Sequence, residues 1–333
     1  MDAGSVAGFT RRSVVGAIAF APLLPLTAFG EDAARPVIGF LRSSPSGPFR
    51  HLVAAFREGL AEAGLEEGEN VSVEYRWANN DLARLPLLAA ELERLGVRVL
   101  VGNSLAIEAA REAAPTLPLV FVTADDPVKS GYVESLNSPG GNITGVTFFA
   151  GGQLGAKRLE LLKELMPGAR RFAILFDPNY PGFQTELPNI ETAARRLEIE
   201  LMKVAAAHPA EFAPAFEEIR RRGAGGILLG GSPMFTGARK DLTSVAQAHS
   251  ILVIYDQRDH VAAGGLISYG ASFTGAYRLA GKYAGLIATG TQPSELPVVQ
   301  PAELELVVNL RTAAALGLDV PETILLRADE VIE

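Results

Sequence analysis

Short runs of apolar, often β-branched residues alternate along the chain with longer stretches whose apolar residues recur at helical spacing. The runs are typical of buried strands, and the first four are VIGFL from Val37, VSVEYRW, VRVLVG and LPLVFV. Between them lie the helix-period stretches RHLVAAFREGLAEAG, RLPLLAAELERLG and AIEAAREAA. This order predicts strands and helices in strict alternation.

The same order returns from Phe172. The strands FAILF, IELMKVAA, GGILLG and ILVIY alternate with the helical stretches NIETAARRLE, AEFAPAFEEIRRRG and ARKDLTSVAQAHS. Strands separated by helices need right-handed crossovers and a parallel sheet covered on both faces. The sequence therefore predicts an α/β protein with two doubly wound parallel-sheet lobes.

The end of the chain departs from this alternation. After GLISYG comes a helical stretch, AYRLAGKYAGLIATG, followed by ELVVNL and a short helix TAAALG. We interpret this as a return to lobe 1 for the helix, then to lobe 2 for the last strand. The expected division is 36–146 plus 270–292 for lobe 1, and 147–269 plus 293–333 for lobe 2. The crossings between the lobes form a multi-strand hinge.

A long connection, Asp125–Val146, lies near the middle of the chain and contains two prolines and an adjacent glycine pair. Connections in α/β units usually take roughly 2–6 residues. It holds no histidine, cysteine or recognisable nucleophile. We expect it to be the first crossing of the hinge, because glycines absorb backbone change and prolines limit where the change occurs.

The N-terminus carries the three-part pattern of an export signal. Arg11 and Arg12 precede an apolar stretch at residues 14–29, and Ala28-Phe29-Gly30 follows the small-x-small rule before Glu31. The apolar stretch is interrupted by two prolines and is shorter than the roughly 20 residues of a membrane span. We expect residues 1–30 to be a signal peptide cleaved near Gly30, by either the Tat or the Sec route. The mature protein is expected in the periplasm.

Composition excludes several kinds of site. The net charge is −8 and no block of Lys and Arg stands out, which argues against nucleic acid as a partner. Cysteine is absent, so disulfides and thiolate chemistry are excluded. The 4 histidines show no metal-ligand spacing, and no phosphate-binding glycine motif follows a strand. We expect no metal, no cofactor and no catalytic residue.

Ligands of open parallel sheets bind beyond the carboxyl ends of the strands, where helices begin. This rule selects Ser46, Asp126, Asn179 and Gln257 together with ten further residues, which are the ligand-binding candidates. They are Ser43, Ser44, Asn103, Ser104, Thr123 and Asp125 in lobe 1, and Asp177, Tyr180, Ser232 and Asp256 in lobe 2. Lobe 1 offers mainly hydroxyls and amides, whereas lobe 2 offers carboxylates and a tyrosine. A ligand with an anionic end and a cationic or polar end suits such a cleft.

Structural roles for these residues remain open. Serines and threonines at such positions often cap helices, and Asp177 before a proline is also typical of a turn. Trp77 ends a strand and is either packing or the wall of a pocket. A hydrolase is a further alternative, because Ser104 lies in a G-x-S-x-A sequence and His260 follows later in the chain.

Several segments together resemble a known family. They are PVIGFLRSS from Pro36, VSVEYRWANND, DPV with the later PGGNITGVT, and the C-terminal ELVVNLRTAAALGLDVPETILLRADEVIE. The chain from Pro36 to Glu333 is similar to a bacterial ABC-transporter substrate-binding family that includes periplasmic tryptophan- and tyrosine-binding proteins. Asp126 occupies the family's DPV position, and Asp125 is an additional carboxylate.

The resemblance implies a type I periplasmic-binding-protein architecture with the ligand held between the lobes. We therefore expect a monomeric receptor that delivers an amino acid, or an aromatic or other carboxylate, to an inner-membrane ABC permease. Ser44, Ser104 and Thr123 are expected to hold the carboxylate, and Asp256 or Asp177 an amino group. An exported ligand sensor with the same clamshell is the alternative.

Overall fold

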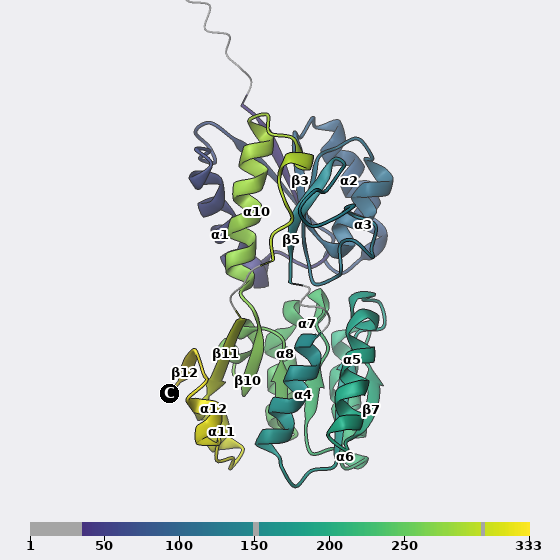
Figure 1. The fold of residues 1–333 in the computed structure, drawn as a ribbon, viewed down its shortest axis with the longest axis vertical. Helices are drawn as coiled ribbons and strands as arrows, with labels where there is room; N and C mark the ends of the chain where they lie inside the picture. Colours follow the sequence, from purple (N-terminus) through teal and green to yellow (C-terminus); the bar gives the residue numbers. More distant parts are fainter. Residues whose placement is uncertain (1–34, 149–152, 301–303) are drawn as a thin grey trace, which may run out of the picture. The chain divides into compact units, whose positions relative to one another are not determined.

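The computed structural model describes residues 35–148, 153–300 and 304–333. The expected signal peptide, residues 1–30, lies outside the described residues. The described chain contains a five-stranded and a seven-stranded sheet (Figure 1). This confirms the predicted α/β class with two parallel-dominated sheets. The set of helices in the described part is broader than the sequence pattern gave, because several are only one turn long.

The five-stranded sheet is wholly parallel, in the order β2-β1-β3-β4-β5. Its strands are β1 (Val37–Arg42), β2 (Ser72–Trp77), β3 (Val99–Asn103), β4 (Leu119–Thr123) and β5 (Ile143–Thr147). Its helices are α1 (Arg50–Glu62), α2 (Leu85–Arg94), α3 (Ser104–Ala113) and α10 (Phe273–Ala288), with one-turn η1 (Gly47–Phe49), η2 (Leu82–Arg84) and η4 (Pro293–Glu295). Alternate residues of β1 pack into two different cores. Phe40 packs into the core formed with α1 and α10, and Leu41 packs into the core formed with α2 and α3. Helices therefore cover both faces.

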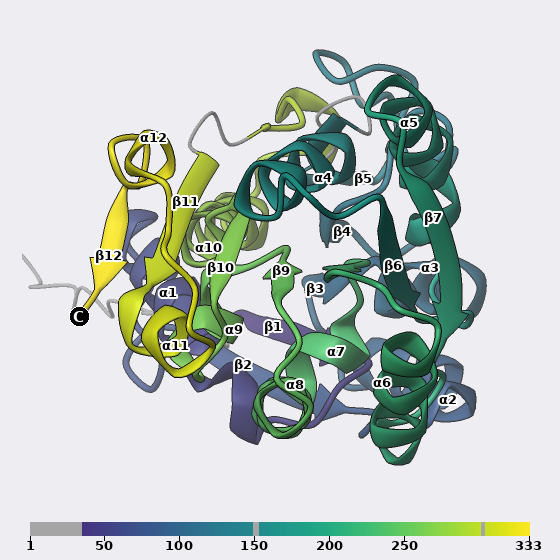
Figure 2. The same ribbon diagram turned by 90° about the horizontal axis from the view of Figure 1, so that it is seen from below.

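The seven-stranded sheet has the order β12-β11-β10-β9-β8-β6-β7. Its strands are β6 (Arg171–Phe176), β7 (Glu200–Ala205), β8 (Ile227–Leu229), β9 (Val253–Tyr255), β10 (Ile267–Ala271), β11 (Leu304–Asn309) and β12 (Glu330–Ile332). Its helices are α4 (Gln153–Leu165), α5 (Gly182–Arg196), η3 (Pro209–Glu211), α6 (Phe212–Arg221), α7 (Pro233–Gly237), α8 (Arg239–Ala248), α9 (Arg258–Ala262), α11 (Leu310–Ala315) and α12 (Glu322–Leu325). Figure 2 shows α4 and α5 on one face and α6 and α8 on the other. Only the β10–β11 pair is antiparallel.

The chain passes between the sheets in three places. It leaves β5 for α4, it passes from β10 to α10, and it returns to β11 after a segment at 296–299 that bonds beside β5. This segment keeps residues 293–300 with the five-stranded sheet, and β10 keeps residues up to Ala271 with the seven-stranded one. The expected boundaries at 270 and 293 thus lie a few residues from where the chain leaves each sheet.

The expectation that Asp125–Val146 forms the first crossing is wrong. Its end is the strand β5, which pairs in parallel with β4 over Ile143–Thr147. The loop before it folds back on the same lobe, where Tyr132 and Val133 are buried in the core with α2 and α3. The long connection is therefore the crossover from β4 to β5, and the crossing between lobes comes after Thr147.

Candidate functional site

Strand ends from both sheets meet around a small cavity of about 50 Å³, and a second cavity of the same volume beside them is lined by Ser43 and Asp177. The polar lining of the first cavity is Arg42, Asn103 and Ser104 from the lobe of the five-stranded sheet, and Ser232, Thr236, Asp256 and Gln257 from the lobe of the seven-stranded sheet. Its aromatic lining is Phe148, Tyr180, Phe273 and Tyr277. Pockets for small molecules usually exceed roughly 300 Å³. A ligand of amino-acid size therefore needs the lobes to part or the lining side chains to move.

Five of the ten candidates line this cavity, and five do not. Those that line it are Asn103, Ser104, Tyr180, Ser232 and Asp256. Those that do not are Ser43, Ser44, Thr123, Asp125 and Asp177, all of which are buried. A larger crevice of about 520 Å³ runs along α4 and α5 and contains none of the ten. The junction of the two sheets is therefore where the candidates gather.

Two candidate pairs hold loops in place. Asn103 accepts from the backbone N–H of Ser43 at 3.1 Å and donates to its hydroxyl at 2.9 Å, which ties the end of β1 to the end of β3. Ser232 donates to Asp177 at 2.7 Å and accepts from the N–H of Met234, so it caps α7. These four side chains have their main hydrogen bonds within the protein, which supports the capping and turn roles left open above.

Ser104, Thr123 and Asp125 form a buried chain of hydrogen bonds. Thr123 donates its hydroxyl proton to the Asp125 carboxylate at 2.8 Å, and Ser104 lies 2.8 Å from the Thr123 oxygen. Ser104 also makes side-chain hydrogen bonds with Asp125 and with Tyr180 of the other lobe. Burial raises the pKa of Asp125, against the opposing effect of hydrogen bonds from Thr123 and Ser104. This edge of the cavity is acceptor-rich.

Arg42, the last residue of β1, places a buried guanidinium at the cavity. Its Nε donates to the Ser44 hydroxyl at 3.4 Å and its Nη1 to the Tyr277 hydroxyl. The group also lies 4.0 Å from the ring centroid of Phe49 and 5.1 Å from that of Tyr277. Burial lowers the pKa of Arg42, and Tyr277 opposes this. Among the described residues no carboxylate pairs with it.

This unpaired charge has an energetic consequence. Removing an ion from water costs several kcal/mol, and buried charges in proteins are normally paired. A desolvated cation–π contact returns about 2 kcal/mol, and a hydrogen bond from a charged group about 1.5–3 kcal/mol. These contacts offset the cost of burying Arg42, but they supply no opposite charge.

Aromatic rings form another part of the cavity wall. Phe148 follows β5 and Phe273 begins α10, and their rings stack at a centroid distance of 4.4 Å and an angle of 5°. Tyr180, from the loop after β6, and Tyr277, from α10, also line the cavity and are buried. Flat apolar faces beside a few polar groups are typical of small-molecule pockets. Trp77 lies elsewhere, partly buried against the core at 5.7 Å from Phe40.

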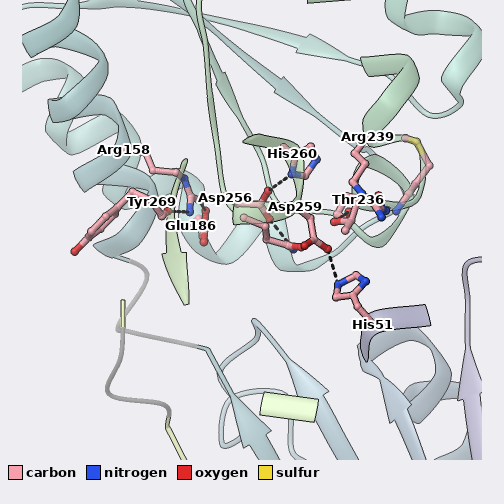
Figure 3. A network of polar contacts seen from close by, with 12 residues as sticks. His51, Arg158, Glu186, Thr236, Arg239, Asp256, Asp259, His260 and Tyr269 are labelled. Atoms are coloured by element: carbon pink, nitrogen blue, oxygen red, sulfur yellow. Dashed lines mark hydrogen bonds and ion pairs between the residues drawn. The ribbon is translucent and has the colours of Figure 1, made fainter. Parts of the chain in front are cut away.

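Asp256 follows β9 (Figure 3), and it forms the polar part of the lining there together with Gln257. Gln257 donates to Asp256 Oδ2 at 3.2 Å, and Gln257 Oε1 is buried without a hydrogen bond among the described residues. Asp256 Oδ1 lies 3.7 Å from Nδ1 of His260. His260 is fully buried and stacks on Tyr255, and its burial lowers its pKa. The neutral imidazole leaves the Asp256 charge uncompensated.

A buried ion pair lies beside these carboxylates (Figure 3). Arg158 of α4 donates to Glu186 of α5 at 2.9 Å and to the Tyr269 carbonyl at 3.3 Å. Burial raises the pKa of Glu186; Arg158 opposes this, and the charges of Asp256 and Asp125 add to it. The pair joins two helices near the carboxylates of the cavity.

Several contacts among the described residues connect the two lobes, and three of them surround the cavity. His51 Nε2 of α1 lies 2.8 Å from Asp259 Oδ2 of α9 (Figure 3). Arg239, at the start of α8, donates to the Pro48 carbonyl at 2.7 Å. Gly182 packs so closely on Asp125 that an added Cβ would lie 2.5 Å from its Oδ1. The lobes are therefore in direct contact around the cavity.

The sequence rule missed Arg42, Phe148, Phe273 and Tyr277. Arg42 ends the apolar run VIGFLR, so its place at a strand end was a usable signal. The aromatic residues gave no signal. They follow β5, which the sequence pattern did not predict, or lie in α10, whose position beside β1 depends on a crossing between lobes.

The hydrolase alternative has no geometric support. Ser104 is bonded to Thr123, and within the described chain no histidine is hydrogen-bonded to it. His260 is packed instead against Tyr255 and Asp256. In the described ranges there is also no group of three metal-ligating side chains. None of the described helices is both long and apolar enough to cross a membrane.

Two α/β lobes, three connections and a cavity lined from both define a two-lobed binding protein. A family model for ABC transporter substrate binding proteins matches residues 46–332, and the chain belongs to this family. It is a family of binding proteins and not of enzymes, which confirms the expectation of no catalysis. The resemblance inferred from sequence segments is thereby also confirmed.

Similar proteins have been described in several bacteria. The chain is 22% identical over 264 residues to the tyrosine-binding protein of Clostridioides difficile, covering 79% of this chain and 75% of that protein. Its fold matches a conserved domain protein of Vibrio cholerae with a TM-score of 0.82 at 23% identity, covering 89% and 99% of the two chains. It also matches an ABC domain in complex with L-Trp from Streptococcus pneumonia, with a TM-score of 0.81, 22% identity, and coverage of 90% and 100%.

Proposed function

We propose that this substrate-binding protein is the periplasmic receptor of an ABC importer, and that it traps an amino acid, or an aromatic or other carboxylate, between its lobes. The observation that carries the proposal is the cavity at the junction of the sheets, with a buried arginine, stacked phenylalanines and an aspartate in its lining. These groups suit a small ligand with a charged end and an apolar or aromatic body. The named ligands of the related proteins, tyrosine and L-Trp, are of this kind.

In the proposed mechanism the protein performs no covalent chemistry. A ligand that contacts Ser104 of one lobe and Gln257 of the other binds the closed form more tightly than the open one. Only such differential contacts favour closure, because equal affinity for both forms shifts nothing. A micromolar ligand supplies about 8 kcal/mol, which also has to cover the cost of populating the closed form. The closed monomer then delivers the ligand to a permease in the inner membrane.

A ligand screen tests this proposal. The purified protein is heated with each of the standard amino acids, with aromatic carboxylic acids and with sugars, and the melting temperature is followed. A ligand at 100 times its Kd stabilises the native state by about 2.7 kcal/mol. We expect a shift with at least one amino acid or carboxylate. If no compound of any class raises the melting temperature, the receptor proposal fails.

Two further experiments address the importer role. Cell fractionation should recover the protein in the periplasm, without the residues up to about Gly30. Ligand uptake into cells that express a permease encoded next to the gene of this protein should depend on the receptor. Uptake that is unchanged without it, together with intact ligand binding, would instead favour an exported sensor.

A further inference from the structure

The charge of Arg42 stands out because nothing in the described chain neutralises it. Its hydrogen-bond acceptors, Ser44 and Tyr277, are neutral hydroxyls. Its Nη2 has no acceptor among the described residues. By contrast Arg76, on the adjacent strand β2, is paired with Glu74 at 3.0 Å and Glu91 at 2.9 Å. A buried cation without a carboxylate partner, such as Arg42 at the wall of a cavity, is suited to bind an anion from outside the chain.

The surroundings restrict the anion. Asp256 lines the same cavity, and the charges of Asp125 and Asp256 both act on Glu186 near it. A multiply charged anion such as phosphate would be repelled by these carboxylates. A single carboxylate fits, since a guanidinium binds it through two parallel N–H···O bonds. A ligand ammonium would suit the acceptor groups of Ser104, Asp256 and Gln257.

We propose that Arg42 binds the carboxylate of the ligand and thereby restricts the receptor to compounds with a free carboxylate. This inference rests on the proposed function and assigns the anion to a residue other than the hydroxyls of Ser44, Ser104 and Thr123. Ser44 and Tyr277 then orient the guanidinium through hydrogen bonds, and the ring of Phe49 packs against it. The ring contacts hold the fork in one position before the ligand arrives, which limits the entropy lost on binding.

The test compares matched ligands by isothermal titration. The probes are L-tryptophan and L-tyrosine, their amides and decarboxylated amines, the other standard amino acids, the aromatic carboxylic acids of the ligand screen, and the uncharged sugars ribose and myo-inositol. We expect binding only among compounds with a free carboxylate. Equal binding of an amide or amine overturns the inference, and so does binding of sugars alone. In both of those outcomes the receptor function stands, whereas binding of no probe at all contradicts both.

Variants of Arg42 give the second arm. We expect Arg42→Met to weaken binding of the best carboxylate about 100-fold or more, because it leaves the ligand charge buried and unpaired. Arg42→Lys keeps the charge but not the fork, and should bind about 10-fold less tightly than wild type. The control Arg76→Gln removes an arginine of the same sheet that already has carboxylate partners, and should leave affinity unchanged.

Stability separates this role from a structural one. Without ligand, Arg42→Met should melt at or above the wild-type temperature, since replacing an uncompensated buried charge by an apolar side chain is often neutral or stabilising. A large fall in melting temperature with unchanged ligand affinity shows that Arg42 only supports the fold, and overturns the inference. If Arg42→Met does not fold, the affinity of Arg42→Lys decides, and wild-type affinity in that variant has the same meaning.

Discussion

At the scale of single residues, the site is built from side chains whose surroundings change their ordinary chemistry. Asp125 is a carboxylate buried beside two hydroxyls and the tightly packed Gly182. Arg42 is a buried cation without a counter-ion in the described chain. Such groups lower stability in isolation and are typical of functional sites, where a ligand later compensates them.

Asp125 gives a prediction about pH. Burial raises its pKa in the folded protein, so its favourable contribution is present below the unfolded pKa and is lost as pH rises through the folded pKa. At neutral pH the ionised group is therefore destabilising, and Asp125→Asn should raise the melting temperature. This gain in melting temperature should disappear near pH 3, where Asp125 of the wild type is protonated in both the folded and the unfolded state. Thermal unfolding of the two proteins from pH 3 to pH 8 measures this, and a constant difference across that range would contradict it.

Asp256 gives a prediction about binding. If its carboxylate meets a ligand ammonium, Asp256→Ala leaves that charge buried without a partner and should cost about 3–5 kcal/mol of binding. Calorimetry with the ligand found by screening measures the loss. Asp241 of α8 offers the control. Asp241→Ala also removes one carboxylate from the same lobe, but this carboxylate is exposed. Near-wild-type affinity of Asp256→Ala would eliminate this role.

At the scale of elements, the decisive contact is that of α10 with α1. Helix α10 arrives from the seven-stranded sheet and packs on α1 with the two backbones almost touching. An added Cβ on Gly281 would lie 2.0 Å from the Phe56 carbonyl, and one on Gly59 would lie 1.8 Å from the Arg278 carbonyl. Glycine is required at both positions because any side chain would separate the helices. The same packing brings Tyr277 to Arg42.

Gly281→Ala should therefore destabilise the protein by about 1–3 kcal/mol, although alanine is the better helix former by about 1 kcal/mol. Gly275→Ala is the control in the same helix, since an added Cβ there would meet only Ser272 atoms at 3.7 Å or more. It should be neutral or slightly stabilising. Urea unfolding of both variants measures the difference, and equal stability of the two would show that α10 shifts without cost.

At the scale of the whole molecule, the proposed binding cycle depends on contacts between the lobes. His51–Asp259 and Arg239–Pro48 join α1 and η1 to α8 and α9. In the proposed mechanism, opening of the cavity breaks them. They are partly exposed, so each contributes modestly to the closed form.

Removing the His51–Asp259 contact should accelerate ligand release. We expect His51→Ala to raise koff about 1.4–5-fold, because an exposed pair contributes roughly 0.2–1 kcal/mol. Burial acts to raise the pKa of Asp259, but the hydrogen bond and charge of His51 and the charge of Arg239 hold it below its usual value. Its contribution is present above the ordinary carboxylate range and is lost as pH falls below about 3.9.

Stopped-flow release of ligand at a series of pH values from 7 down to 3 measures this effect. The difference between wild type and His51→Ala should be present at pH 7 and should decrease as the pH falls through the folded pKa of Asp259. Arg57→Ala is a control in α1, since Arg57 pairs with Glu67 in its own lobe. An effect of Arg57→Ala as large as that of His51→Ala would show that the lobe contact is not responsible.

Hydrophobic periodicity alone determined the two α/β lobes. The runs VIGFL and FAILF predict buried strands, because both faces of such a strand are apolar. A parallel sheet with helices on both sides covers both faces. Strand ends then placed Ser104 and Asp256 each at the carboxyl edge of its own sheet, since the carboxyl ends of parallel strands meet at one edge. These inferences use contacts between neighbours in sequence and in the sheet.

Only the tertiary structure decided the rest. Whether Asp125–Val146 crosses between lobes depended on the weakly apolar strand ITGVT finding β4, which no local pattern records. Whether the guanidinium of Arg42 is paired with an opposite charge depended on the packing of distant residues. Its hydrogen-bond partner Tyr277 lies 235 residues away in the sequence. Charge pairing and cavity walls arise from the packing of distant elements, so they are properties of the folded chain and not of any segment of its sequence.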